Sequence, residues 1–90
     1  MASVIIKKPT HQELSADKVL QWPVWEKEAS IFDWYYDNEE HCYIVEGHII
    51  VETDEGDYEI KKGDYVIFAK GLKCIWNVKS DVKKHYKFIG

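Results

Sequence analysis

The 90-residue sequence predicts an all-β fold, and its spacing of apolar runs and turns is the main reason. Between Tyr43 and Phe68, apolar and β-branched residues come in short runs. Each run ends at a turn that contains glycine, such as Asp54-Glu55-Gly56-Asp57 or Lys62-Gly63-Asp64. These turns leave no room for a helix of ordinary length. A meander of antiparallel strands this tight is expected to close into a barrel or a sandwich.

Composition limits the classes of function. The chain is 46% hydrophobic and 14% aromatic, which suits a compact β core and argues against disorder. We expect a single domain, residues 1–90, that hides roughly 60% of the surface of the unfolded chain. Its net charge is -4, so no basic field attracts phosphate backbones, and nucleic acid is not an expected partner.

The first residues predict neither export nor membrane insertion. Val4-Ile5-Ile6 is followed at once by Lys7-Lys8, and so short an apolar run is neither a signal peptide nor a membrane span. A cytoplasmic protein without a membrane partner is therefore expected. In that compartment Cys42 and Cys74 remain reduced thiols.

The elements can be taken in chain order. Residues 3–7 form a predicted strand that Pro9 ends. Thr10-His11-Gln12-Glu13 has the spacing of a capping box, which favours a short helical turn near residues 11–14. Pro23 excludes a continuing helix. Strands are predicted at residues 30–36, 41–46, 48–53, 58–60, 65–68, 74–78 and 82–88. Turns are predicted at 37–38, at 80–81 and at Gly47, where glycine is expected to have a positive φ.

The order of Glu40, Tyr43-Ile44-Val45-Glu46-Gly47, Gly63-Asp64 and Lys70-Gly71 resembles the two conserved motifs of the cupin superfamily. Those motifs read G-x5-H-x-H-x3-4-E-x6-G and G-x5-P-x-G-x2-H-x3-N. The resemblance implies a small single-domain cupin, a jelly-roll β-barrel, over nearly the whole chain. Further details resemble the very small cupins related to the (S)-ureidoglycine aminohydrolase cupin domain: Trp22-Pro23, Trp25, Phe32, Trp34, Cys42 and Lys84-His85-Tyr86.

The metal-binding positions of the motifs are mostly replaced. Glu40 stands where the resemblance places the glutamate ligand, and Cys74 stands at the histidine of the second motif. The H-x-H pair falls on Asp33 and Tyr35 or on Trp34 and Tyr36, depending on the spacing, and neither choice supplies an imidazole. A metal site needs three or four converging ligands. Two possibilities therefore stay open: Glu40 and Cys74 bind a divalent metal, or the protein binds no metal.

Period-two alternation predicts which side chains face the interior. If Glu40 points inward, Cys42 and Ile44 share its face, while His41, Tyr43 and Val45 point outward. The expected ligand-binding residues are Trp34, Tyr36, Glu40, Cys42, Phe68, Cys74 and Trp76, and Val66 and Val78 line the same interior. The result is a mostly apolar concavity with few polar groups, which is typical of a small-molecule site.

Three functions are compatible with this pattern. The favoured hypothesis is a module that binds a small molecule inside the barrel, with a degenerate metal site. The second is a metal-dependent enzyme on a small nitrogenous or carbonyl compound, as the resemblance to ureidoglycine aminohydrolase implies. The third is an interaction protein without a small ligand. A homodimer is expected and is compatible with all three functions. Cupins commonly dimerise through sheet faces or edges, and this chain resembles them in having outward Tyr43 and Val45.

Overall fold

The structure is a computed structural model that describes residues 3–89. The described elements, in chain order, are β1 (Val4–Lys7), α1 (His11–Ala16), the 3-10 turn η1 (Val19–Gln21), β2 (Val24–Lys27), β3 (Ser30–Tyr35), β4 (Glu39–Thr53), β5 (Gly56–Lys61), β6 (Tyr65–Phe68) and β7 (Lys73–Ile89). No helix within residues 3–89 is long and apolar enough to cross a bilayer.

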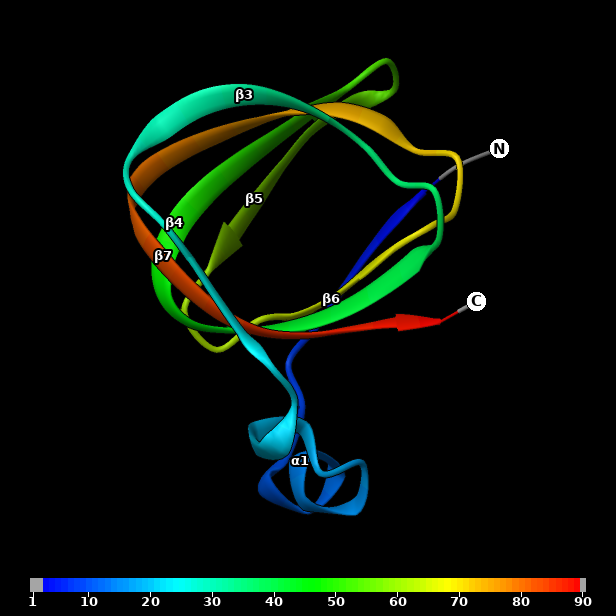
Figure 1. Cartoon of the computed structure of the whole chain (residues 1–90), viewed down its shortest axis with the longest axis vertical. Helices are drawn as coiled ribbons and strands as arrows, with labels where there is room; N and C mark the ends of the chain where they lie inside the picture. The colour runs from blue at the N-terminus through cyan, green and yellow to red at the C-terminus, as the bar shows by residue number, and fades with distance from the viewer. Residues whose placement is uncertain (1–2, 90) are drawn as a thin grey trace.

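The two long strands organise the sheet. β4 and β7 pair with each other along most of their length and curve around the molecule (Figure 1). The sheet order is β1-β6-β4-β7-β2, with β3 added to β7 and β5 added to β4, and all of these pairs are antiparallel. The helical segment, blue in Figure 1, lies beyond one end of the barrel. The predicted all-β jelly-roll barrel with a short N-terminal helical turn is confirmed.

The capping box sets the start of α1. The backbone N–H of Glu13 donates to Thr10 Oγ1 over 3.2 Å, and the Thr10 N–H donates to Glu13 Oε1 over 3.0 Å. Two amides that a helix start leaves without intrahelical partners are thereby satisfied. Leu14 is the buried residue of this helix, which is too short to be stable without packing.

Two predicted chain reversals are wrong. β4 runs through Gly47 and β7 runs through Ser80-Asp81, each as one strand. Gly47 does have the predicted positive φ, +118°, but within an irregular stretch of the β4–β7 ladder and not in a turn. Such irregularities bend and twist strands, so the residues that break the sequence pattern curve the barrel wall. The strand β2 is not among the predicted strands. It has only four residues and begins directly after Trp22-Pro23, so the sequence there does not show a strand pattern.

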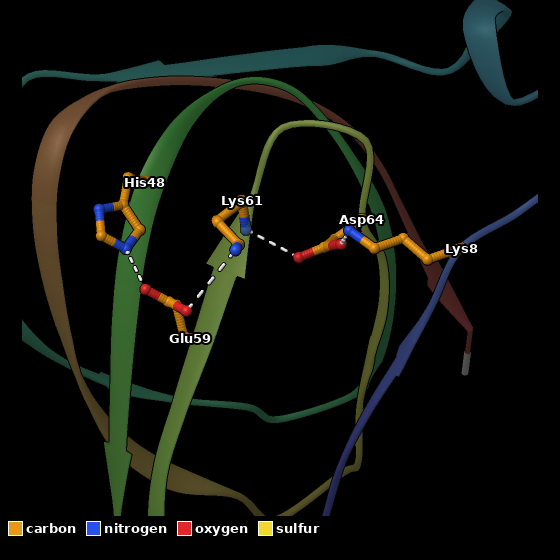
Figure 2. A network of polar contacts seen from close by, with 5 residues as sticks. All are labelled: Lys8, His48, Glu59, Lys61 and Asp64. Carbon is orange, nitrogen blue, oxygen red and sulfur yellow. Dashed lines mark hydrogen bonds and ion pairs between the residues drawn. The ribbon is translucent and has the colours of Figure 1, made fainter.

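The Gly63-Asp64 motif closes the β5–β6 turn. Asp64 is buried, and its Oδ2 accepts the backbone N–H of Lys61 over 2.8 Å, while Lys8 Nζ binds its other oxygen (Figure 2). Figure 2 also shows Glu59 between His48 and Lys61 on the outer surface. The buried carboxylate therefore holds together the turn and the N-terminal segment, and it does not face the interior site described next.

Candidate functional site

The barrel interior contains a cavity of about 150 Å³ between β2, β3, β4 and β7. Its lining residues are Trp25, Phe32, Trp34, Tyr36, Glu40, Trp76, Lys84, Tyr86 and Phe88. Trp34 and Phe88 are 46% and 47% exposed, so they lie at the mouth. Alternate residues of each strand supply these side chains, as expected for the inner face of a barrel. The wall is aromatic apart from one carboxylate and one ammonium group.

Trp76 is at the centre of the aromatic wall. Its ring stacks on Phe32 with centroids 6.0 Å apart and meets the ring of Trp25 edge-on at 5.9 Å. Its indole N–H donates to the Tyr36 hydroxyl over 3.2 Å. Offset-stacked and edge-on ring pairs add about 0.5–1.5 kcal/mol each beyond area burial. Trp76 therefore contacts rings from β2, from β3 and from Tyr36, which follows β3, and holds them in fixed orientations around the cavity.

A buried ion pair supplies the polar part of the site. Lys84 Nζ lies 2.9 Å from Glu40 Oε2, and the exposed fractions of the two side chains are 6% and 4%. The same ammonium lies 4.9 Å from the ring centroid of Trp25 and 4.6 Å from that of Trp76. Trp25 is the direct cross-strand partner of Lys84, so the sheet register brings the indole to the ammonium.

The sequence-predicted site residues divide into two groups. Four of them line the cavity: Trp34, Tyr36, Glu40 and Trp76. Cys42, Phe68 and Cys74 are buried in the core and are not part of its lining. Phe68 stacks on the Tyr36 ring, with centroids 4.8 Å apart. The predicted interior face is therefore correct, whereas ligand binding by any of these seven residues stays a prediction.

Sequence reasoning missed Lys84, the cation of the site. Val82, Lys84 and Tyr86 alternate along β7, and Val82 is 2% exposed, so period two alone places Lys84 inside. The residue type gives no such signal, because lysines are almost never fully buried unless paired. Its neighbour His85 faces the other way, and its Nδ1 lies 2.9 Å from the carbonyl oxygen of Trp22.

The donor groups of the cavity do not fit the metal that the cupin fold implies. Within residues 3–89, no three His, Cys, Asp or Glu side chains are placed to hold an ion. Glu40 is bound by the Lys84 ammonium, which already supplies a positive charge to that carboxylate. Burial raises the pKa of the Cys74 thiol to about 11, which opposes the thiolate form that metals bind. The predicted Glu40 and Cys74 ligand pair is therefore not assembled as a metal site.

Both thiols are expected to be unreactive in the folded protein. Burial raises the pKa of Cys42 to about 12 and that of Cys74 to about 11, from an ordinary value of 9.0. At pH 8 the thiolate fraction of Cys74 is then about 100-fold lower than in the unfolded chain, and alkylation by iodoacetamide should be slowed at least as much. Mass spectrometry of native and urea-unfolded protein measures both rates. Equal alkylation rates in the folded and unfolded protein would contradict the burial of the two thiols.

Comparisons with known proteins agree with this fold. Residues 14–86 match the family described as the EutQ-like cupin domain. The crystal structure of a DUF861 family protein from Thermotoga maritima is 52% identical, with a TM-score of 0.94 over 97% of this chain and 100% of that one. A search of functionally curated proteins found no match.

More distant structures are similar in fold alone. The Clostridium difficile EutQ protein is 22% identical with a TM-score of 0.67, over 72% of this chain and 52% of that one. A putative ethanolamine utilization protein Q from Salmonella typhimurium is 20% identical with a TM-score of 0.66, over 72% of this chain and 53% of that one. With the family match and the 52% identical structure, the chain belongs to the EutQ-like cupin domain family.

Proposed function

We propose that this cupin binds a small, flat, uncharged polar molecule in the aromatic cavity. The observation that carries the proposal is the buried Glu40–Lys84 ion pair, which places one acceptor and one donor in an otherwise aromatic wall. Convergent polar groups in an apolar concavity are the usual make-up of a ligand site. Of the two residues, Glu40 stands where the resemblance to the cupin motif expects the metal-binding glutamate.

The size and charge of the cavity limit the ligand. An apolar cavity of about 150 Å³ in another protein holds one benzene molecule, and the volume here is similar. The charges of Glu40 and Lys84 balance each other, so a charged ligand would be buried without a counter-ion at a large cost. We expect a planar ring or conjugated group of benzene size with a neutral carboxamide, ureido or carbonyl group.

Benzamide is a suitable first probe, because it has a flat ring and a neutral group that can both donate and accept. Titration of the protein with benzamide is expected to change tryptophan fluorescence saturably, since Trp25, Trp34 and Trp76 all line the cavity. Benzoate and benzylamine, which have the same ring and a charge, are expected to bind more weakly.

Adjacent residues of β3 provide matched variants for this titration. Trp34 lines the mouth of the cavity, whereas Tyr35 points to the opposite face of the strand and is 56% exposed. Trp34→Ala should weaken benzamide binding about 10-fold, which corresponds to one lost aromatic contact. Tyr35→Ala should leave it unchanged. The proposal fails if benzamide gives no saturable signal, or if the two variants weaken binding equally.

The alternative is a metal-dependent enzyme on a small nitrogenous or carbonyl compound, which the resemblance to the ureidoglycine aminohydrolase domain implies. The engagement of Glu40 by Lys84 counts against it. Elemental analysis of protein purified without chelators distinguishes the two functions. Stoichiometric iron, manganese, zinc or nickel that is lost in Glu40→Gln would favour the enzyme.

A further inference from the structure

Lys84 is an unusual lysine in this chain. The sequence contains twelve lysines, all within the described residues, and Lys84 alone among them is buried. Its amine lines the cavity and lies beside two indole rings and a carboxylate. A lysine desolvated in an apolar pocket, with a base in reach, is the arrangement from which enzymes make amine nucleophiles.

We propose that Lys84 is a carbonyl-reactive amine, which forms a Schiff base with a small, neutral aldehyde or ketone in this cavity. The inference rests on the proposed function, since the carbonyl compound must enter the same site. Glu40 is assigned as the proton acceptor and donor for the condensation, because its Oε2 is the atom 2.9 Å from the Lys84 nitrogen. A group within hydrogen-bond reach of the proton it moves meets the geometric condition for general acid–base catalysis.

The reaction balances without any further reagent. Glu40 takes a proton from the Lys84 ammonium, and the freed amine attacks the carbonyl carbon, so that a C–N bond forms and the oxygen takes the proton from Glu40. Glu40 then removes a proton from the nitrogen and returns it to the hydroxyl group, which leaves as water. The product is an iminium on Lys84, one water and a carboxylate on Glu40.

The charges of the site favour this product. One positive charge is present on the Lys84 nitrogen before and after the reaction, so the iminium stays paired with Glu40 and stays beside the rings of Trp25 and Trp76. The aromatic walls limit access of the water that would reverse the condensation. An α-keto acid would bring a second carboxylate next to Glu40, so neutral carbonyl compounds are the expected class.

Reductive trapping tests the inference on the whole protein. Benzaldehyde at limiting concentration with sodium cyanoborohydride should place one benzyl group on Lys84, at a rate on the order of ten-fold or more above that of any other lysine. Peptide mapping by mass spectrometry gives the position. Pyruvate under the same conditions should label Lys84 no faster than the other lysines.

Two variants and one competitor serve as controls. Lys84→Met should remove the fast label, whereas Lys83→Met, which changes the adjacent and more exposed lysine, should keep it. If Lys84→Met does not fold, the inference is tested by competition on the wild-type protein. Saturating benzamide should then protect Lys84 from labelling and leave the labelling of the other lysines unchanged. Glu40→Gln should slow the labelling of Lys84 by about ten-fold or more, because the proton acceptor is lost.

The outcomes separate this inference from the proposed function. Fast, benzamide-sensitive labelling of Lys84 supports both. Benzamide binding together with even labelling of all lysines overturns the Schiff-base inference and leaves small-molecule binding intact. Fast labelling of Lys84 that benzamide does not affect overturns the inference as stated, since the reaction would then occur outside the proposed binding mode. The absence of both binding and fast labelling overturns both.

Discussion

Lys84→Met is expected to lower the free energy of unfolding by about 3–5 kcal/mol, which is the usual cost of removing one partner of a buried ion pair. The Glu40 side chain is 4% exposed, so loss of the ammonium leaves its carboxylate charged and desolvated. The substitution also removes the cation that lies near the rings of Trp25 and Trp76. Urea unfolding followed by circular dichroism measures the change.

The matched double variant distinguishes an uncompensated charge from lost packing. Glu40→Leu combined with Lys84→Met removes both charges and keeps apolar side chains of similar size. It should regain most of the lost stability, because apolar replacement of a whole buried pair is often neutral or stabilising. Lys83→Met, at a partly exposed position, should stay within about 0.5 kcal/mol of the wild type. A Lys84→Met change below about 1 kcal/mol would contradict the buried pair.

A fully stable double variant would have a functional meaning. It would show that the fold does not need the charges of Glu40 and Lys84. Buried charges that a protein keeps without a gain in stability are best explained by function, because active sites are where stability is commonly traded for activity. Loss of benzamide binding in the same double variant would then connect the ion pair directly to the ligand.

Gly47→Val is expected to destabilise the protein by about 3–5 kcal/mol, from backbone strain of about 1–3 kcal/mol and overpacking of similar size. Gly47 has a φ of +118°, which side chains rarely adopt. A Cβ there would lie 2.8 Å from the Val82 Cα and 3.0 Å from the Asp81 oxygen, both backbone atoms that cannot rotate away. Thermal unfolding, together with a urea titration, measures the decrease in the free energy of unfolding.

Gly63 is the control for the backbone part of this effect. Its φ is +90°, and a Cβ there would meet nothing within 4 Å. Gly63→Ala therefore adds strain without a clash and should cost only about 1–3 kcal/mol. If Gly47→Val and Gly63→Ala are equally destabilising, the close approach of β4 to Val82 does not contribute, and the barrel wall bends at that point more easily than the distances imply.

Much of the barrel could be predicted because strand patterns are local. Alternation along β4 and the late part of the chain placed Glu40, Cys42, Trp76 and Val78 on the inner face, where each is buried. The capping box predicted the start of α1 for the same reason, since its hydrogen bonds join residues three apart. Gly47 and Ser80-Asp81 resembled turns, because a local pattern does not distinguish a reversal from a bend within a long strand.

Local patterns in the amino-acid sequence are enough to predict the fold class, the interior face of most strands and the lack of histidines at the motif positions. The contact between Glu40 and Lys84 is not predictable in this way, because it joins two strands that are distant in the sequence. Glu40 and Lys84 are 44 positions apart, and their contact depends on the β4–β7 register, which places Lys84 opposite Ile44. Register is set by packing along whole strands and not by any single residue. The pairing of the Glu40 carboxylate with the Lys84 ammonium therefore follows from the folded sheet.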